Sequence, residues 1–490
     1  MKKKGIVIGA GIAGIATAIR LAQKGYAVEV YEANPYPGGK LSSFTLGEYR
    51  FDAGPSLFTM PQFVDELFTL CGENPRDHFN YTKKEIACQY FWEDGMRLTA
   101  YSDKEAFAQE VETKLGVPAT RLNTYLKKAK KKFDLTSGIF LHQSLHQWKT
   151  YCSWETLKAL IHTGKMEIGK TLDSVNQDQL KEPHLVQLYN RYATYNGSSP
   201  YKTPGIMSLI QHLESHYGTF IPKGGMVEIS QSLFALAQRQ GVRFQMGKKV
   251  EQILVENKRA VGVLVEGEKQ EADWVVSNMD VFPTYKQLLP NTKMPSNVQQ
   301  EERSSSAVIF YWGIEKKFPQ LDLHNILFSD HYREEFTAIF EEKSVYSDPT
   351  IYVNITAKNE ANDAPNGCEN WFVMVNTPAD YGQNWSEEIP RLRQQVLKKL
   401  NRVLQTDLAP LIAEETVMSP PEIQAKTQSH LGALYGASSN NKMAAFLRHP
   451  NFKRSINNLY FCGGSVHPGG GIPLCLLSAK IVSDQFPSPA

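Results

Sequence analysis

The sequence predicts an α/β fold with more than one domain, and three observations carry that prediction. Near the N-terminus, a short apolar strand runs into a glycine-rich turn and a helix. Near the other end, a second strand enters a glycine-rich turn of its own, again followed by a helix. Between them lie strands rich in aromatic and β-branched residues, which is typical of a further sheet. At 490 residues the chain is also long for a single domain.

The composition excludes several classes of protein. Lys and Arg number 53 and Asp and Glu 51, so the net charge of +2 lacks the basic excess of a nucleic-acid-binding protein. The six cysteines are scattered without a CxxC pair, which argues against a disulfide framework or a metal site and favours a reducing compartment. The N-terminal apolar stretch is interrupted by glycines, and no other stretch approaches the ~20 apolar residues of a spanning helix. We therefore expect a cytoplasmic protein, either soluble or peripheral on the cytoplasmic membrane.

The N-terminal segment has the pattern of a dinucleotide-binding βαβ unit. Gly5–Ile8 is expected to form a buried strand. It is followed by Gly9-Ala10-Gly11-Ile12-Ala13-Gly14, which matches GxGxxG, and by a helix to about Lys24. Tyr26–Glu32 alternates as a second strand and ends in an acid. A lone GxGxxG is a weak signal, but strand, helix and acid together predict a Rossmann-like domain.

Each glycine of this motif has a physical role in binding. The first permits the tight turn, the second lets a pyrophosphate approach the backbone, and the third lets the helix lie close to the strand. The helix N-terminus then faces the phosphate charge, and Glu32 can accept hydrogen bonds from ribose hydroxyls. A tight strand–helix turn without a ligand is the alternative. The candidate cofactor-binding residues here are Gly9, Gly11, Ile12, Ala13, Gly14 and Glu32.

The second glycine-rich turn indicates which dinucleotide is bound. A strand at Asn458–Cys462 enters the turn, and a helix begins at about Pro473, a residue suited to a first helical position. A nicotinamide cofactor needs one bared helix N-terminus, whereas FAD, with its pyrophosphate at one helix and its isoalloxazine ring at the other, would use both. A plain loop is the alternative. FAD is therefore the expected cofactor, and the residues implied at this end are Gly463, Gly464, Gly471, Ile472 and Pro473.

Together with several other segments, these motifs resemble the bacterial-type phytoene desaturase family of carotenoid enzymes. Matches run from residue 5 to about residue 482, so the resemblance covers essentially the whole chain. The further segments are Pro37-Gly38-Gly39-Lys40, Phe51-Asp52-Ala53-Gly54-Pro55-Ser56, Phe220–Met226, Val275–Asp280, Gly432–Gly436 and His467–Pro473. The resemblance implies FAD contacts at Gly39, Lys40, Gly54, Pro55 and Ser56, and at the backbone of Val250 near the adenine end. An ordinary sheet-edge valine is the alternative at Val250. Lys40 departs from the many relatives that carry arginine there, and lysine cannot make the same forked contact.

What the resemblance implies is an FAD-dependent carotenoid desaturase acting on a polyene drawn from the bilayer. Residues 469–478 resemble the 1-hydroxycarotenoid 3,4-desaturase branch more than enzymes acting on phytoene. The alternatives are a phytoene- or dehydrosqualene-type desaturase, a terminal carotenoid oxidase, a flavin amine oxidase, and a non-enzymatic isoprenoid-lipid carrier of the GDP-dissociation-inhibitor type. The sequence leaves the electron acceptor unspecified.

The expected reaction removes a hydride to flavin N5 and a proton, so a strong general base is unnecessary if the cation is delocalised in the polyene. His467 is the titratable side chain of the second glycine-rich turn and the candidate catalytic residue, with a turn-stabilising role as the alternative. Asp52 is expected to fix its own loop. Tyr192, Tyr195 and Asn196 are candidates for lining a channel, although core packing explains them equally well.

The expected architecture is a discontinuous FAD-binding domain, an α+β substrate domain and a helical membrane-contact region. The FAD-binding domain is assigned residues 1–70, 216–285 and 440–490, the substrate domain 71–119 and 286–439, and the membrane-contact region 120–215. For the second FAD-binding part we expect a helix over 226–240 and strands at Arg243–Met246, Lys249–Glu256, Ala260–Val265 and Trp274–Ser277. For the substrate domain we expect strands at Ala307–Ile314, Thr350–Ile355 and Trp371–Asn376, a helix over Ser386–Leu404, and polar linkers at Asn291–Ser306 and Asn359–Asn370.

The membrane-contact prediction rests on a basic cluster beside apolar and aromatic residues. Lys127–Lys132 carries five lysines, a composition suited to an interface rather than a span. A solvated charged face over an ordinary core helix is the alternative. The apolar and aromatic residues that follow the cluster are Ile139, Phe140, Leu141, Leu145, Trp148, Tyr151, Trp154, Leu157, Leu160 and Ile161.

Overall fold

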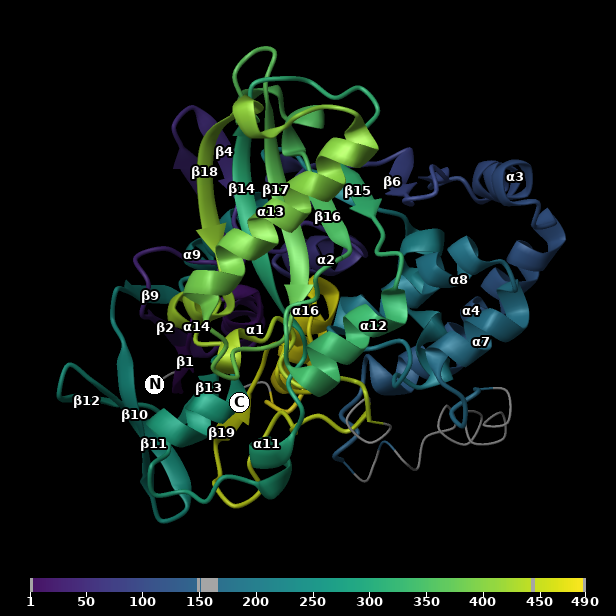
Figure 1. Ribbon diagram of the computed structural model, residues 1–490. Helices are drawn as coiled ribbons and strands as arrows, with labels where there is room; N and C mark the ends of the chain where they lie inside the picture. The colour runs from purple at the N-terminus through teal and green to yellow at the C-terminus, as the bar shows by residue number, and fades with distance from the viewer. Residues whose placement is uncertain (1–2, 148–149, 151–165, 442–445, 488–490) are drawn as a thin grey trace.

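The computed structural model describes residues 3–147, 150, 166–441 and 446–487. A seven-stranded sheet fills the upper part of Figure 1 and a five-stranded sheet the lower part, with a group of helices to their right. The five-stranded sheet is entirely parallel, in the order β19-β13-β1-β2-β9. Three separated stretches of chain therefore build one sheet. Its strands are β1 (Lys4–Ile8), β2 (Ala27–Glu32), β9 (Arg243–Met246), β13 (Trp274–Ser277) and β19 (Leu459–Phe461).

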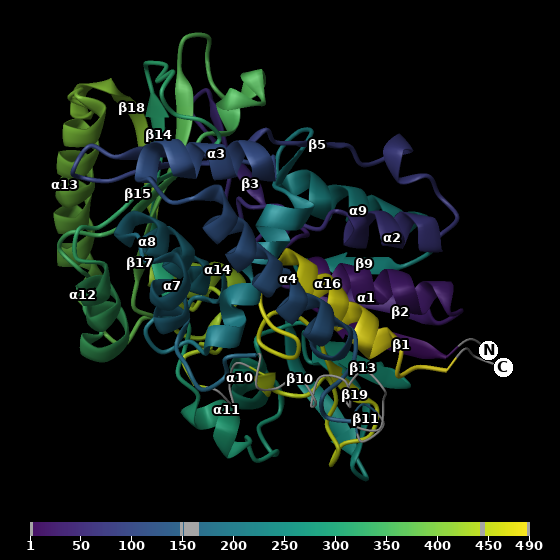
Figure 2. The same cartoon turned by 90° about the vertical axis from the view of Figure 1, so that its right-hand side faces the viewer.

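Helices cover this parallel sheet and share one apolar core. Figure 2 shows them stacked beside one another, and their inward faces pack together. The approach of α1 to β1 requires glycine at position 14, because a Cβ there would lie 2.1 Å from the carbonyl oxygen of Gly9. The predicted βαβ unit is thus confirmed as local structure. The helices are α1 (Ile12–Gln23), α2 (Gln62–Leu70), α9 (Val227–Arg239) and α16 (Ile472–Ser483).

The seven-stranded sheet is mixed, with the order β18-β14-β17-β16-β15-β6-β7. One of its faces packs on the long helix α13 (Trp385–Leu404) around the fully buried rings of Trp312 and Trp371. Figure 2 shows α13 lying along this face. The strands are β6 (Ile86–Phe91), β7 (Arg97–Tyr101), β14 (Ser306–Ile314), β15 (His324–Leu327), β16 (Ile351–Asn354), β17 (Glu369–Thr377) and β18 (Ile412–Met418).

Smaller sheets connect these two layers. A hairpin of β3 (Ser43–Leu46) and β4 (Tyr49–Asp52) packs on the seven-stranded sheet, where the ring of Phe44 contacts that of Tyr311 edge to face. The antiparallel strands β10 (Val250–Glu256), β11 (Arg259–Val265) and β12 (Glu268–Glu271) stand beside the parallel sheet. A further pair is formed by β5 (Tyr81–Lys83) and β8 (Phe220–Pro222).

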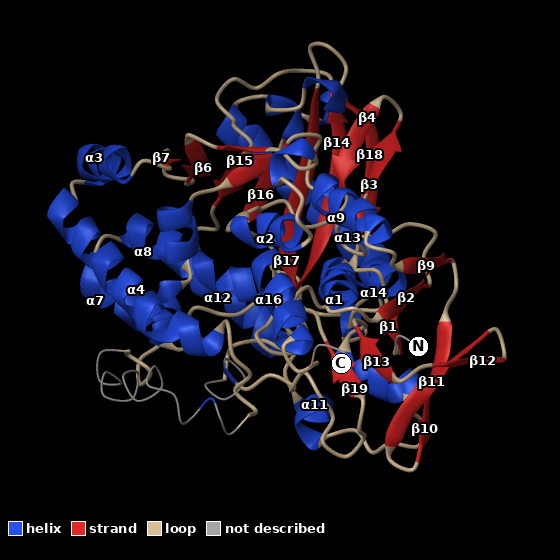
Figure 3. Ribbon diagram, turned by 180° about the vertical axis from the view of Figure 1, so that it is seen from behind, coloured by secondary structure: helices blue, strands red, loops and turns tan. Residues whose placement is uncertain are grey.

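The helical group lies to one side, as Figure 3 shows from behind. It is formed mainly by α3 (Lys104–Leu115), α4 (Ala119–Phe140), α7 (Leu172–Leu180) and α8 (Pro183–Asn190). The other short helices and turns are α10 (Val281–Pro283), α11 (Ser296–Gln300), α12 (Tyr332–Thr337), α14 (Pro420–Thr427), η1 (Pro75–Asp77), η3 (Arg191–Asn196), η4 (Gly205–Leu209), η5 (Leu213–Tyr217), η6 (Thr284–Leu288), η7 (Ala338–Glu342), η8 (Thr356–Lys358), η9 (Ala361–Asp363), η10 (Ala409–Leu411) and η11 (His430–Gly432). Among the described residues, none of the helices has the length and apolar character needed to cross a membrane.

The predicted strands and helices are confirmed, with ends that differ by no more than two residues. The two predicted linkers differ more. Residues 291–306 contain α11, and Arg303 is buried there because it pairs with Glu301, at 3.2 Å between Nη1 and Oε1. Residues 359–370 end inside β17, where Glu369 is buried against Lys358 at 2.7 Å. Both segments were predicted as polar linkers, but ion pairing allows these charged side chains to be buried within short elements of structure.

The basic cluster is also less exposed than its composition suggests. Lys127, Lys128, Lys130 and Lys131 are exposed on α4, whereas Lys132 is buried and binds Glu167 and Ser208. Lys132 is buried because it lies on the inward-facing side of α4, where residues three or four positions apart share one face. Of the apolar residues that were expected to follow, Trp148, Tyr151, Trp154, Leu157, Leu160 and Ile161 lie outside the described residues.

Candidate cofactor and substrate site

One cavity of about 880 Å³ links the parallel sheet to the seven-stranded sheet. It starts at the carboxyl ends of β1 and β2, passes the first turn of α16 and continues between the seven-stranded sheet and the helical group. The carboxyl edge of a parallel sheet is where α/β proteins bind their ligands. Of the residues predicted to bind the cofactor, all line this cavity except Gly14, which lies beneath the turn against Gly9.

The N-terminus of α1 forms the first part of the cradle, the group of residues around the two helix N-termini that is predicted to hold the cofactor. Gly9 has φ +94°, which favours glycine, and a Cβ on Gly11 would lie 2.7 Å from Nδ2 of Asn278. Gly11 is the N-cap residue and offers no side-chain acceptor, and the first turn holds no acid. The N–H groups of Ile12 and Ala13 therefore stand at the positive end of the helix dipole, facing the cavity.

Glu32 joins this turn to the adenine end of the predicted cofactor. Its Oε2 accepts from the N–H of Ala10 at 2.7 Å and its Oε1 from that of Asn34 at 2.8 Å, so the acid fixes the turn as well as facing the cavity. Oε1 also accepts from Nδ2 of Asn34 at 2.9 Å, so Oε2 is the oxygen that keeps a lone pair for a further donor. The N–H of Lys248 donates to the carbonyl of Glu32 at 2.8 Å, which brings Val250 into the same wall.

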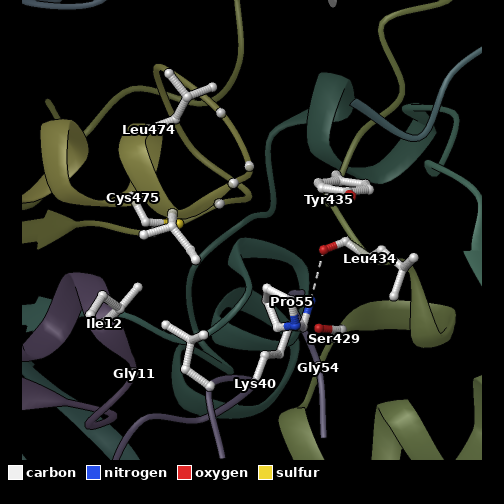
Figure 4. Close-up of a pocket in the computed structure, with 18 of the residues that line it drawn as sticks. Gly11, Ile12, Lys40, Gly54, Pro55, Ser429, Leu434, Tyr435, Leu474 and Cys475 are labelled. Atoms are coloured by element: carbon white, nitrogen blue, oxygen red, sulfur yellow. Dashed lines mark hydrogen bonds between the residues drawn. The ribbon is translucent and has the colours of Figure 1, made fainter. Parts of the chain in front are cut away.

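The N-terminus of α16 forms the second part of the cradle. Gly471 is its N-cap residue, with φ +107° and no side-chain cap, and no atom lies within 4 Å of the position of a Cβ. Helix α16 begins at Ile472, so Pro473 occupies the second helical position rather than the first. The beginning of α1 and the beginning of α16 face the same space in Figure 4, where Ile12 and Cys475 stand near each other. Two uncapped helix N-termini on one cavity fit a cofactor with an anionic centre and a second polar end.

Lys40 closes the cradle from the side. Its Nζ donates to the carbonyl oxygen of Leu434 at 2.8 Å, the dashed line of Figure 4. Burial lowers the pKa of the Lys40 ammonium group. Gly54 passes beneath it, since a Cβ there would lie 2.2 Å from the carbonyl oxygen of Lys40. Pro55 and Ser56 continue this wall, and the Ser56 hydroxyl lies 2.8 Å from that of Tyr352.

His467 lies in the cavity wall between the two cradle helices and the helical group. Its Nε2–H donates to the carbonyl of Gln143 at 2.8 Å, which leaves the lone pair on Nδ1. Burial lowers the pKa of His467 to about 4. Nδ1 is buried and has no hydrogen-bond partner among the described residues. The side chain is therefore neutral near pH 7.

Two supporting side chains differ in how well the sequence indicated them. Asp52 accepts from the N–H groups of Met226 and Val227, at 2.9 and 3.1 Å, and so fixes the start of α9 as well as its own strand. Arg448 was not predicted at all. It is buried in the cavity wall, where its Nη1 donates to the carbonyl of Tyr435 at 2.8 Å and contacts that of Gly464 at 3.3 Å. No local motif marks it, because its partners are backbone carbonyls of other segments.

The rest of the cavity is mainly apolar. One face of the seven-stranded sheet supplies alternate residues of neighbouring strands, as the two-residue period of a strand requires, and the opposite wall comes from α4, η4 and η5. Tyr195 and Asn196 line it, whereas Tyr192 does not and instead bonds to Glu214. The apolar lining residues are Phe133, Phe140, Leu141, Ile206, Met207, Leu209, Ile210 and Leu213 on one side and Ile309, Ile326, Phe372, Met374 and Met418 on the other.

Two uncapped helix N-termini that share a cavity with a long apolar extension fit an FAD-dependent oxidoreductase. Sequence comparison agrees: the family described as flavin containing amine oxidoreductase matches residues 12–485. The chain is 55% identical, over 99% of both chains, to the 1-hydroxycarotenoid 3,4-desaturase of Flavobacterium sp. (strain P99-3). It is 35% identical, over 98% of this chain and 97% of the other, to the 4,4'-diapolycopene oxygenase of Methylomonas sp. The chain thus belongs to the flavin-containing amine oxidoreductases and, within them, to the carotenoid desaturase family.

Solved structures share the fold at low identity. An oxidoreductase from Methanosarcina mazei has a TM-score of 0.63 at 16% identity, covering 98% of this chain and 100% of its own. Putrescine oxidase bound to putrescine has a TM-score of 0.64 at 13% identity, covering 99% and 98%. At such identities the likeness concerns the fold alone. Membership of a flavoenzyme family sets aside the lipid-carrier alternative, in which the cradle would hold no flavin.

Proposed function

We propose that this chain introduces the 3,4 double bond into 1-hydroxycarotenoids as an FAD-dependent desaturase. The observation that carries the proposal is one continuous cavity. It begins between two helix N-termini whose N-cap residues are glycines, and it continues along an apolar face of the seven-stranded sheet. A flavin and a long polyene need such a continuous space. The 55% identity to an enzyme named 1-hydroxycarotenoid 3,4-desaturase supports the choice of reaction.

The proposed cofactor residues divide between the two helix N-termini. Backbone N–H groups at the start of α1 would hold the pyrophosphate, and the α16 end would face the isoalloxazine ring. The proposed set is Gly9, Gly11, Ile12, Ala13, Gly14, Glu32, Gly39, Lys40, Gly54, Pro55, Ser56, Val250, Gly463, Gly464, Gly471, Ile472 and Pro473. In the same proposal, residues 1–70, 216–285 and 440–490 serve the cofactor, and residues 71–119 and 286–439 serve the substrate.

Desaturation removes a hydride and a proton from neighbouring carbons. A bound flavin supplies the hydride acceptor at N5. The positive charge left on the substrate is delocalised along the polyene and makes the adjacent C–H strongly acidic, so a weak base suffices. We propose His467 as that base, because it lines the cavity near the start of α16 and its pKa of about 4 keeps it unprotonated at neutral pH. Unchanged turnover by His467→Ala would remove it from this role.

A second candidate function is oxygenation of a terminal methyl group. It is favoured by 35% identity to 4,4'-diapolycopene oxygenase and 32% identity to the 4,4'-diaponeurosporene oxygenase of Staphylococcus aureus (strain MSSA476), both over nearly the whole chain. The higher identity to the desaturase ranks the 3,4-desaturation first. None of these three relatives is named for an amine, so the amine oxidase alternative ranks below both.

Product analysis distinguishes these candidates. The purified holoenzyme would be given liposomes containing phytoene, a 1-hydroxylated acyclic carotenoid or 4,4'-diapolycopene, and the products separated by HPLC with absorption spectra. A red-shifted product from the hydroxylated compound alone supports 3,4-desaturation. Conversion of phytoene overturns the choice of substrate, and an aldehyde from 4,4'-diapolycopene transfers the proposal to the oxygenase.

We further propose that the helical region, residues 120–215, rests on the cytoplasmic membrane, from which the carotenoid would be drawn. Exposed Lys127, Lys128 and Lys131 on α4 support this, since each basic residue near an anionic surface contributes about 1 kcal/mol. Changing these three to glutamine should weaken co-sedimentation with phosphatidylglycerol vesicles by about tenfold or more. The matched control, Lys316→Gln with Lys317→Gln, removes exposed lysines of the other domain. Equal losses in both variants would contradict the proposal.

A further inference from the structure

A buried ion pair interrupts the apolar wall of the cavity. Arg191, on η3, and Glu214, on η5, both line the cavity, and their Nη2 and Oε2 atoms lie 3.7 Å apart. Both side chains are largely buried, with 11% and 7% of their surface exposed. The neighbouring wall residues, such as Ile206, Met207 and Ile210, are apolar.

Tyrosine side chains surround this pair. The hydroxyls of Tyr192 and Tyr195 both donate to the carboxylate of Glu214, the first at 2.9 Å. Arg191 donates through Nη2 to the hydroxyl of Tyr90 at 2.7 Å and through Nη1 to that of Tyr195 at 3.3 Å. Burial raises the pKa of the Tyr195 phenol, so it stays protonated and remains a donor. Tyr195 is the tyrosine of this group that lines the cavity.

The hydrogen-bonding capacity of this cluster is not exhausted. Nε of Arg191 is buried and has no hydrogen-bond partner among the residues that the structure describes. The Glu214 carboxylate offers about four acceptor sites, of which the two tyrosines use two. The cluster can therefore both donate to and accept from one more polar group, which is the capacity that an alcohol needs.

A channel that binds only a hydrocarbon would not need a buried ion pair such as Arg191 and Glu214. Removing two charges from water costs free energy that their attraction barely repays, and apolar residues of similar volume would serve as well or better. Pockets that are otherwise apolar use a few buried polar groups to orient and select their ligand. A hydrocarbon end placed here would leave the cluster unsatisfied, whereas a hydroxyl would complete it.

We propose that Arg191, Glu214 and Tyr195 form a subsite that hydrogen-bonds the hydroxyl group of the polyene substrate and selects hydroxylated over unhydroxylated carotenoids. The inference deepens the function proposed above and rests on it. The alcohol would donate to the Glu214 carboxylate or to the Tyr195 oxygen, and would accept from Nε of Arg191. These three are specificity-determining residues and take no part in bond breaking.

The test compares two polyenes with the same number of conjugated double bonds, a 1-hydroxylated acyclic carotenoid and the corresponding hydrocarbon. For each, kcat/KM and the dissociation constant for the holoenzyme are measured, the latter by quenching of protein fluorescence. Tyr195→Phe should lower kcat/KM for the hydroxylated polyene about tenfold, as expected for the loss of one hydrogen bond near a charge, and Glu214→Gln should lower it further. The kcat/KM for the hydrocarbon should stay the same or rise, so the ratio of kcat/KM for the hydroxylated polyene to that for the hydrocarbon falls.

Matched controls separate selection from folding. Glu335→Gln changes another buried glutamate, which binds Thr350 at 2.7–2.8 Å and does not line the cavity. Tyr125→Phe removes another buried hydroxyl, bonded to Asn176 at 2.8 Å. Bound FAD and Tm are recorded for every variant, and Tyr195→Phe, which keeps the ring, remains informative if Glu214→Gln does not fold.

The outcomes are distinct. Equal losses for both polyenes, with the ratio unchanged, would show a purely structural cluster and overturn the inference. Turnover of neither polyene by the native enzyme would overturn the proposed function alone, provided that binding still favours the hydroxylated polyene and Tyr195→Phe abolishes that preference. If native binding shows no preference, the subsite itself is overturned.

Discussion

The hydroxyl groups of Ser56 and Tyr352 lie 2.8 Å apart and join the cofactor cradle to the seven-stranded sheet. Ser56 belongs to the turn after β4, and Tyr352 stands on β16 with its ring on the cavity-lining face. The Tyr352 hydroxyl also lies 2.7 Å from Nδ1 of His324. Nδ2 of Asn354 lies 3.2 Å from that same Nδ1, so Tyr352, His324 and Asn354 form one hydrogen-bonded cluster. Ser56 joins this cluster through Tyr352, so a chain of hydrogen bonds runs from the turn after β4 to the seven-stranded sheet.

Removal of the Tyr352 hydroxyl should loosen the substrate wall without emptying the cradle. A neutral hydrogen bond contributes about 0.5–1.5 kcal/mol, so Tyr352→Phe should lower kcat/KM about two- to tenfold. The FAD content should stay unchanged, because the cradle helices do not depend on this bond. Steady-state kinetics and the flavin absorbance of the purified protein check both parts. Loss of FAD instead would assign Tyr352 to the cofactor site.

A side chain at Gly471 should prevent cofactor binding. Gly471→Val would place its side chain in the open space at the start of α16, where no atom lies within 4 Å of the Cβ position. We expect at least tenfold weaker FAD binding, measured by flavin fluorescence titration of the apoprotein. The control is Gly367→Val, which also has a positive φ, +87°, and no atom within 4 Å, but does not line the cavity. Both variants carry a similar backbone strain of about 1–3 kcal/mol, so only the cavity distinguishes them. Equal FAD affinities would contradict the prediction.

Loss of the Asp52 carboxylate should destabilise the protein. Asp52→Ala leaves the N–H groups of Met226 and Val227 without their acceptor, and the expected loss in the free energy of unfolding is about 1–2 kcal/mol. Urea unfolding measures it. Asp103→Ala removes a comparable cap at α3, where Oδ1 accepts from Ala106 at 2.8 Å on the surface, and should cost less. An Asp52→Ala variant as stable as the native protein would exclude the capping role.

Acid should destabilise the protein through its buried histidines. Burial lowers the pKa of His467 to about 4 and that of His449 and His324 to about 3, from 6.5. Below pH 6.5 the unfolded chain binds protons that the folded chain excludes, so the stability present above pH 6.5 is lost as the pH falls towards 4 and then 3. Each such histidine contributes a slope of up to about 1.4 kcal/mol per pH unit.

The pH prediction is checked by chemical unfolding between pH 7 and pH 4. His449→Gln should reduce the slope of unfolding free energy against pH in this range. Nδ1–H of His449 donates to the carbonyl of Pro450 at 2.7 Å, so Nε2 accepts from the Tyr285 hydroxyl at 3.0 Å, a bond that the ring can accept only while it is neutral. A variant with the native slope would show that His449 does not contribute to acid unfolding.

Local motifs were enough to predict the family and the order of the strands, turns and helices around the proposed cofactor site. Gly9 and Gly471 have positive φ angles, and Gly11 leaves no room for a Cβ beside Asn278. Such requirements are local, so short contiguous motifs reveal them. Strand and helix periods depend on neighbours along the chain in the same way, so their ends were predicted closely.

The side chains that meet across segments could not be predicted from the sequence. Arg191 and Glu214, Ser56 and Tyr352, and Arg448 with the carbonyls of Tyr435 and Gly464 come from separate segments. The tertiary structure also placed Lys132 inside and Lys131 outside one basic run. The burial of a charge depends on partners that packing supplies, and no local pattern along the chain records where those partners will lie.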